Sequence, residues 1–96
     1  MRIRELLAAK REEILSAAAR FGASNVRIIG SVARNEDDEN SDLDLLVDLE
    51  KGRSLLDHAG LMLTLQELLG RKVDVATVSG LKTRIRGQIM REAVPL

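Results

Sequence analysis

The sequence predicts an α+β fold, in which a small mixed β-sheet has helices packed on one face. Apolar residues recur at helical spacing near the N-terminus and again between residues 54 and 70. Three shorter segments, at 26–29, 41–49 and 72–78, have the apolar runs or alternation that are typical of strands. The chain has 96 residues. That is the size of one domain, so we expect residues 1–96 to form a single domain.

Composition excludes several classes of protein. There is no cysteine, so disulfides and thiolate metal sites are impossible. The formal net charge is zero, and Phe21 is the only aromatic residue. We therefore expect no strong nucleic-acid binding and no attraction to anionic membranes. No signal peptide and no apolar run long enough to span a bilayer are present. These features predict a soluble cytoplasmic protein without a membrane partner.

The first helix is predicted over residues 2–21 and should cover one face of the sheet. Gly22 is the expected end of this helix. The positions that face the sheet recur at helical spacing and are Ile3, Leu7, Ile14, Ala18 and Phe21.

A second helix is predicted to begin at Ser54, whose side chain forms a cap with Asp57, and to end at Gly70. The inward-facing positions of this helix are expected to be Leu55, Ala59, Met62, Leu65, Leu68 and Leu69. The only histidine, His58, has no second histidine or cysteine with which to share a metal, so we expect it to have a structural role.

The first predicted strand ends in a glycine–serine turn. Val26, Ile28 and Ile29 form a short buried run, and Gly30 and Ser31 follow directly. A short helical segment after this turn would offer free backbone N–H groups at its start. Glycine lets a phosphate approach the backbone, and the serine hydroxyl adds a donor. The pattern fits a phosphate site, and it also fits an ordinary strand-to-helix turn with Ser31 as N-cap.

The second predicted strand carries two aspartates side by side. Its residues alternate from Ser41 onward, so that Asp42 and Asp44 project from the same face. Two residues of strand advance about 6.6 Å, so both carboxylates can bind one cation or bridge two. Carboxylates placed in parallel raise each other's pKa, and Mg²⁺ removes that conflict. The alternative is that both aspartates belong to the solvated face of an edge strand.

The loop between the turn and this strand contains four consecutive acids, at 36–39, and is expected to be solvated. Arg34 lies about one helical turn beyond the glycine–serine turn. It is positioned either to meet the same phosphates or to pair with the acidic loop. Ser41 is expected to orient the carboxylate of Asp42 through a hydrogen bond.

The third predicted strand, at 72–78, contains Asp74 as its only acid. A buried unpaired carboxylate is costly, so this aspartate should have a partner or a metal. The alternative is an acid that lies at the edge of the sheet and is exposed to water. A basic segment follows, in which a short helix interrupted by Gly87 is predicted, with Pro95 beyond its end.

The spacing of these motifs resembles the signature of the nucleotidyltransferase superfamily typified by DNA polymerase beta. In this signature a Gly-Ser pair, here Gly30 and Ser31, is followed after ten residues by Asp-x-Asp, here Asp42 and Asp44. More closely, GSVAR followed by NSDLDLLVDL is similar to the minimal nucleotidyltransferases, the antitoxin type found beside HEPN-domain toxins. The resemblance extends over most of the chain, including the closing REAVPL. One departure is Asn35, where such sequences often carry glycine. Because asparagine tolerates a left-handed backbone, we expect the turn to survive.

The resemblance implies a single minimal nucleotidyltransferase domain over residues 1–96, which transfers AMP from ATP. It implies that the turn holds the triphosphate, with Gly30, Ser31 and Arg34 as the nucleotide-binding residues. It also implies two Mg²⁺ ions on the carboxylates of Asp42, Asp44 and Asp74. Asp74 would in addition act as general base toward the attacking hydroxyl.

The implied acceptor is a hydroxyl group, expected to be that of a tyrosine, on a helical HEPN-domain ribonuclease toxin. Two alternatives remain open. One is a non-catalytic antitoxin, a binding module that blocks its toxin sterically and keeps the carboxylates for folding. The other is a nucleotidyltransferase that acts on a small molecule or an RNA end. A neighbouring gene for a helical ribonuclease would separate the two antitoxin hypotheses from the third.

Overall fold

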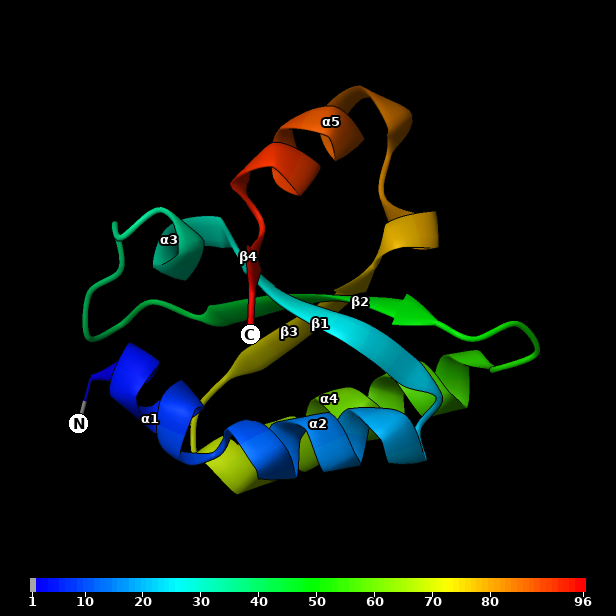
Figure 1. Ribbon diagram of the computed structural model, residues 1–96, viewed down its shortest axis with the longest axis horizontal. Coiled ribbons are helices and arrows are strands. Elements are labelled where there is room, and N and C mark those ends of the chain that lie inside the picture. The colour runs from blue at the N-terminus through cyan, green and yellow to red at the C-terminus, as the bar shows by residue number, and fades with distance from the viewer. Residues whose placement is uncertain (1) are drawn as a thin grey trace.

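The structure is a computed structural model that describes residues 2–96. It contains a four-stranded mixed sheet with helices around it (Figure 1), which confirms the predicted α+β class. The elements in chain order are α1 (Ile3–Ala9), α2 (Arg11–Arg20), β1 (Ala23–Ile29), α3 (Gly30–Ala33), β2 (Leu43–Leu49), α4 (Leu55–Leu69), β3 (Val73–Thr77), the 3₁₀ helix η1 (Val78–Gly80), α5 (Thr83–Glu92) and β4 (Val94–Pro95).

The strand order in the sheet is β3-β2-β1-β4. β1 runs antiparallel to both β2 and β4, whereas β2 and β3 are parallel. The parallel pair follows from α4, because two parallel neighbours need a crossover between them. β3 and β4 therefore form the two edges of the sheet. β4 was not predicted, because a two-residue strand that contains Pro95 has no sequence pattern of its own.

The hydrophobic core lies between the sheet and the helices α2 and α4 (Figure 1). The alternation predicted for β2 is confirmed, because Leu43, Leu45 and Val47 are at most 1% exposed. From α4, the residues buried against this face are Leu61, Leu65 and Leu69. Leu55 was expected to face inward and is instead 79% exposed, because the first turn of α4 extends beyond the sheet.

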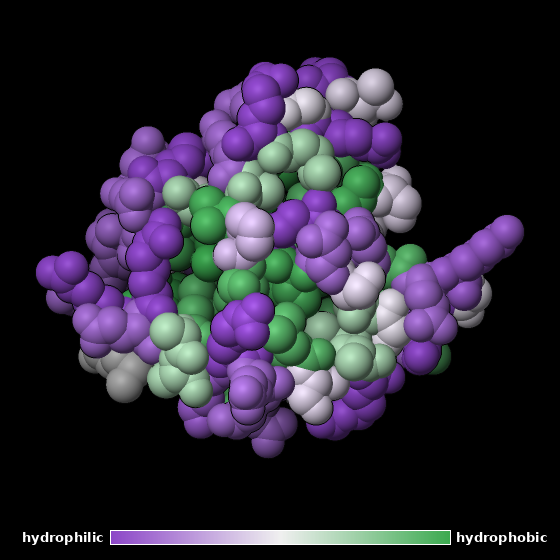
Figure 2. All heavy atoms as spheres, in the orientation of Figure 1, coloured by the Kyte–Doolittle hydropathy of each residue, from purple (hydrophilic) through white to green (hydrophobic). Residues whose placement is uncertain are grey.

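The opposite face of the sheet is more polar and has α5 on its side (Figure 1). Arg27, Asp44 and Leu46 lie on this face, as their pairing between β1 and β2 shows. Leu46 is fully buried, so this face is covered over part of its area. Figure 2 shows apolar side chains in the middle of the molecule, between the hydrophilic surface of α5 and that of the N-terminal helices.

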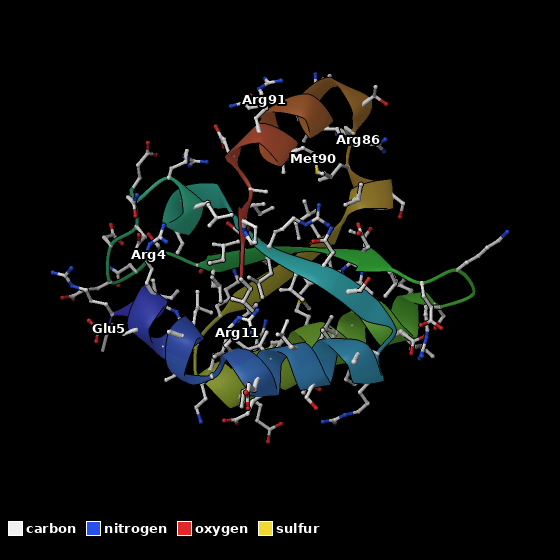
Figure 3. All side chains as sticks on the ribbon, viewed as in Figure 1. Arg4, Glu5, Arg11, Arg86, Met90 and Arg91 are labelled. Atoms are coloured by element: carbon white, nitrogen blue, oxygen red, sulfur yellow. The ribbon has the colours of Figure 1, made fainter. Side chains whose placement is uncertain are left out.

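The N-terminal helix predicted over residues 2–21 is in fact two helices, separated at Lys10, whose backbone is not helical. α1 turns toward α3, where Arg4 Nη2 donates to the carbonyl oxygen of Val32 at 2.6 Å (Figure 3). The apolar stripe does not reveal this bend, because both halves keep the same helical spacing. None of the helices within residues 2–96 has the length and apolar character that a membrane crossing requires.

The predicted limits of α4 are confirmed. Ser54 and Asp57 form a capping box, and Gly70 ends the helix with a left-handed backbone at φ 64°. His58 has the structural contact expected of it, since its ring nitrogen hydrogen-bonds the carbonyl oxygen of Val75 on β3. This contact ties the crossover helix to the strand that follows it.

Candidate active site

The glycine–serine turn is in direct contact with Asp44 of β2. Ile29 and Asp44 are register partners on the antiparallel strands β1 and β2, so the residue after Ile29 lies beside the Asp44 side chain. A Cβ added at Gly30 would lie 2.5 Å from Asp44 Oδ2, and Gly30 has a left-handed φ of 74°. Both facts require glycine at this position. The sheet thus joins the two motifs that are separated by the acidic loop.

The alternative in which Ser31 acts as the N-cap of the following helix is wrong. α3 begins at Gly30, its N-cap residue is Ile29, and no side chain caps the helix. The turn is so tight that Ser31 already lies within the first helical turn. Its hydroxyl is therefore not used as a cap. The left-handed backbone expected of Asn35 is confirmed, with φ at 58°.

Asp44 lies at the centre of a group of charges. Burial raises the pKa of Asp44, and the negative charges of Asp74 and Asp42 raise it further. The positive charges of Arg34 and Lys72 act in the opposite direction. A half-buried carboxylate with two like charges beside it is an electrostatic conflict that a bound cation would relieve.

Asp42 lies directly before β2, and its Oδ2 forms an ion pair with Lys72 Nζ at 3.5 Å. Lys72 was not among the predicted site residues. The pairing of Leu43 with Val73 brings it there, because Asp42 and Lys72 are the residues that precede this pair.

The prediction that Ser41 orients Asp42 is wrong. The Ser41 hydroxyl accepts a hydrogen bond from the backbone N–H of Asp38 at 2.9 Å and also contacts the Asp38 carboxylate at 3.3 Å. A short polar side chain in a loop bonds its own local backbone readily, and here this local turn takes the hydroxyl away from the aspartate.

Asp74 is the register partner of Asp44 on the parallel strand β3. Register partners project from the same face of a sheet, so the third predicted carboxylate lies beside that of Asp44. The expectation that Asp74 is buried is wrong, since its side chain is exposed at the edge of the sheet. Its place beside Asp44 follows from strand register, and the cost of burial has no part in it.

Arg34 ends α3 and is exposed. Its Nε pairs with Glu36 Oε2 at 3.0 Å, and its Nη1 pairs with Glu92 Oε2 on α5 at 3.4 Å. The hydrogen bond with Glu36 raises the pKa of Arg34 above its ordinary value. Pairing with the acidic loop, one of the two alternatives for this residue, is therefore observed. Its charge also acts on Asp44, so the guanidinium is within electrostatic reach of the carboxylates.

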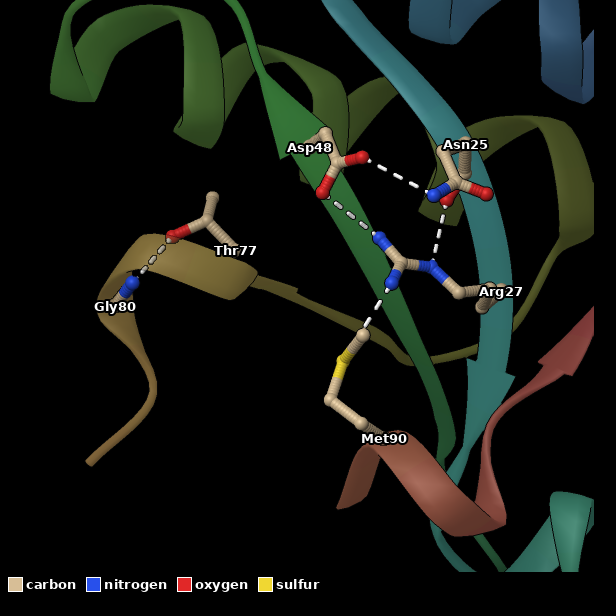
Figure 4. A network of polar contacts seen from close by, with 6 residues as sticks. All are labelled: Asn25, Arg27, Asp48, Thr77, Gly80 and Met90. Atoms are coloured by element: carbon tan, nitrogen blue, oxygen red, sulfur yellow. Dashed lines mark hydrogen bonds and ion pairs between the residues drawn. The ribbon is translucent and has the colours of Figure 1, made fainter. Parts of the chain in front are cut away.

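A second polar network lies on the same face of the sheet and was not anticipated (Figure 4). Arg27 is 7% exposed, and its Nη2 donates to Asp48 Oδ1 at 2.9 Å. Its Nε donates to the carbonyl oxygen of Asn25 at 2.9 Å, and its Nη1 contacts the sulfur of Met90 at 3.6 Å. This network joins β1, β2 and α5, and it shows how α5 is attached to the sheet.

Within residues 2–96, no three histidine, aspartate or glutamate side chains are arranged as a complete metal site. The donor set nevertheless suits Mg²⁺, which prefers oxygen ligands and is usually held by one or two carboxylates together with substrate phosphates. The like charges around Asp44 supply the unfavourable interaction that such an ion would remove. The residues fit a magnesium ion that enters together with a nucleotide.

Comparison with known proteins agrees with this geometry. A sequence profile of the nucleotidyltransferase domain matches residues 11–96. Protein adenylyltransferase MntA of Thermococcus cleftensis is 39% identical over 92 residues, covering 96% of this chain and 90% of the relative. A second relative is MJ0435 of Methanocaldococcus jannaschii, whose name assigns it to the protein adenylyltransferases. It is 39% identical over 84 residues, covering 88% of this chain and 90% of the relative.

Solved structures give the same result. One whose description assigns it to the minimal nucleotidyltransferases has a TM-score of 0.87 and 58% identity, covering 96% of this chain and 94% of the other. A crystal structure of a toxin–antitoxin with AMP-PNP has a TM-score of 0.74 over 88% of this chain and 69% of that one. Its identity of 17% extends the likeness to the fold alone. The chain therefore belongs to the nucleotidyltransferase domain family, which makes it a transferase, as its turn and carboxylates predict.

Proposed function

We propose that this protein transfers AMP from ATP to a hydroxyl group of another protein and thereby acts as the antitoxin of a HEPN-domain toxin. Tyrosine is the expected acceptor residue. The observation that carries the proposal is the contact between the Gly30 turn and Asp44, with Asp42 and Asp74 beside it. The names of the relatives, and a solved toxin–antitoxin that contains AMP-PNP, support both the nucleotide and the kind of partner.

In this proposal the turn binds the triphosphate. The missing side chain of Gly30 leaves its backbone open to a phosphate, and the hydroxyl of Ser31 adds a donor. Arg34 would exchange Glu36 or Glu92 for a phosphate oxygen. Arg34 and Glu36 are exposed and Glu92 is only partly buried, so both ion pairs are weak and the exchange costs little.

Asp42 and Asp44, with Asp74 beside them, would hold Mg²⁺. When bound, the metal supplies charge stabilisation for the α-phosphate and for the departing pyrophosphate. Asp74 takes the proton of the acceptor hydroxyl as the oxygen forms its bond to the α-phosphorus and the bond to the bridging oxygen breaks. Its exposure at the sheet edge leaves it accessible to a hydroxyl that a separate protein brings.

We further propose that residues 1–96 act as one domain. Buried residues from α1 through to β3 belong to one core, which supports this proposal.

The first test measures nucleotide binding. Mg²⁺ with ATP should raise the melting temperature of the wild type, because a ligand of the folded state stabilises it by mass action. The variant Asp42→Asn/Asp44→Asn should lose this increase and remain folded. As a matched control, Glu12→Gln/Glu67→Gln removes two exposed acids from α2 and α4 and should keep it. An unchanged increase in the aspartate variant would refute the assignment of the site.

The second test concerns the acceptor. After incubation with this protein, Mg²⁺ and ATP, a candidate toxin should gain about 329 Da for each AMP added. It should also stay inactive once this protein is removed, because the bond is covalent. A steric antitoxin would give no gain in mass and full recovery of the toxin on separation. Protection by Asp42→Asn/Asp44→Asn equal to that of the wild type would exclude catalysis as the mechanism.

A further inference from the structure

The basic residues of the C-terminal part of the chain are concentrated on one weakly packed helix. The segment 82–92 contains four basic residues and one acid, Glu92, and so has a net charge of +3. The whole chain is neutral, so the remainder has a net charge of −3. The four basic residues are exposed and are Lys82, Arg84, Arg86 and Arg91. Within the part of the chain that the structure describes, none of the four forms an ion pair.

These charges do not hold the fold together. α5 buries none of its residues, and its apolar Ile85 and Met90 are 39% and 41% exposed. The helix is attached through the contact of Arg27 with Met90, the ion pair of Arg34 with Glu92, and the pairing of β4 with β1. Its basic side chains are therefore available for another molecule.

α5 also borders the proposed active site. Its last residue, Glu92, pairs with Arg34, and the charge of Arg34 acts on Asp44. Arg84 and Arg91 are seven residues apart, which places them on the same side of the helix. Figure 3 shows Arg91 extending away from the sheet, whereas Met90 points toward it.

We propose that α5 is the docking surface for an acidic segment of the acceptor protein, which it holds beside Asp42, Asp44 and Asp74. This inference rests on the proposed function, in which the acceptor is a protein. The carboxylates of the site and the acids at 36–39 repel an acidic partner, so such a partner approaches along α5. Arginine is enriched in protein interfaces, and Ile85 adds apolar contact at the side of this surface.

A protein fits this surface better than single-stranded nucleic acid does. Binding of single strands depends on aromatic side chains on which bases stack. The only aromatic residue, Phe21, follows α2 and packs against the core and Gly60 of α4, on the other side of the sheet from α5. The observations therefore favour an acidic peptide as the ligand.

The probe for the test is a fluorescein-labelled peptide that contains one tyrosine among glutamates, and its binding is followed by fluorescence anisotropy. The wild type should bind it, with affinity that falls as salt rises. Arg84→Gln/Arg91→Gln should weaken binding about tenfold and flatten the salt dependence. Arg20→Gln/Lys51→Gln removes the same charge away from α5 and should bind as the wild type does.

The proposal is overturned if the wild type does not bind the peptide. It is also overturned if Arg84→Gln/Arg91→Gln and the control Arg20→Gln/Lys51→Gln lose affinity equally. It is also overturned if single-stranded RNA of equal charge binds more tightly and loses that affinity in Arg84→Gln/Arg91→Gln. The single charge reversal Arg84→Glu repeats the test with one exposed substitution, in case the double variant unfolds. Each variant is first checked for an intact melting transition.

The same variants separate this inference from the proposed function. The increase in melting temperature with Mg²⁺ and ATP should be equal in wild type and Arg84→Gln/Arg91→Gln, because neither arginine belongs to the nucleotide site. Absence of that increase in the wild type would contradict the proposed function and leave the peptide result standing. If the wild type keeps the increase in melting temperature but the arginine variant binds the peptide as tightly as the wild type does, only the role of α5 is contradicted.

Discussion

Asp44 and Asp74 are register partners on the parallel strands β2 and β3, so both carboxylates project from the same face of the sheet. Neighbouring strands are about 4.8 Å apart, which brings two negative charges close together. The pair is asymmetric, because Asp44 is half-buried against the Gly30 turn and Asp74 is exposed. This asymmetry is consistent with the proposed roles, in which all three carboxylates hold the metal and the accessible Asp74 is also the general base.

Gly30→Ala should destabilise the protein more than Gly52→Ala does. Both glycines have positive φ, at 74° and 91°, so either substitution strains the backbone by about 1–2 kcal/mol. Only at Gly30 would the new methyl group also meet Asp44, whereas nothing lies within 4 Å at Gly52. Thermal unfolding of the two variants measures the difference. Equal losses of stability in the two variants would show that the contact with Asp44 contributes nothing to the difference. The double variant Gly30→Ala/Asp44→Ala should recover part of the stability lost in Gly30→Ala.

Asp44→Asn should be at least as stable as the wild type near neutral pH. Burial and two neighbouring carboxylates raise the pKa of Asp44 above 3.8. Between the two values the folded state keeps a proton that the unfolded state has lost, and above both values the ionised carboxylate costs the folded state stability. The stability that this group contributes is present below 3.8 and is lost as pH rises through the raised value. Asparagine does not ionise and avoids that loss.

Urea unfolding of wild type and Asp44→Asn at about pH 3 and about pH 7 tests this sign. The stability of the variant relative to the wild type should increase from the lower pH to the higher. A difference that is the same at both pH values would mean that Asp44 does not titrate with a raised pKa.

Lys72→Met should change the titration of Asp44 with little change in stability. The ion pair of Lys72 with Asp42 is largely exposed, so its loss should alter the free energy of unfolding by less than about 0.5 kcal/mol. The charge of Lys72 lowers the pKa of Asp44, so removing it should raise that pKa further. NMR titration of the carboxyl carbons measures this shift, and Lys51→Met is the control. An identical Asp44 titration in both variants would place Lys72 outside the site.

Asp74→Asn should keep ATP binding and slow transfer by about 10²–10⁴, the range for loss of a general base. Calorimetry with ATP and Mg²⁺ measures the binding, and incorporation of AMP into the acceptor measures the transfer. Because Asp74 raises the pKa of Asp44, the variant should also lower that pKa. Turnover equal to that of the wild type would return Asp74 to the role of an exposed acid on an edge strand.

Local patterns predicted the features that depend on neighbouring residues. The capping box at Ser54, the left-handed Gly70 and the alternation of Leu43, Leu45 and Val47 are all as expected. Each of these features follows from backbone preference or from the period of a strand. None of them depends on which helix or strand packs against the segment. The same reasoning failed for Leu55 and for the bend at Lys10, because helical spacing says nothing about where the sheet ends.

The class of fold, the glycine–serine turn and the pair Asp42 and Asp44 can be read from the amino-acid sequence, since turn chemistry and side-chain alternation are local properties. The contact of Gly30 with Asp44 and the pairing of Lys72 with Asp42 become visible only in the folded chain. Both contacts depend on strand register and on which strands are neighbours. Register is set when a whole face of the sheet is buried against α2 and α4, and no single segment contains that information.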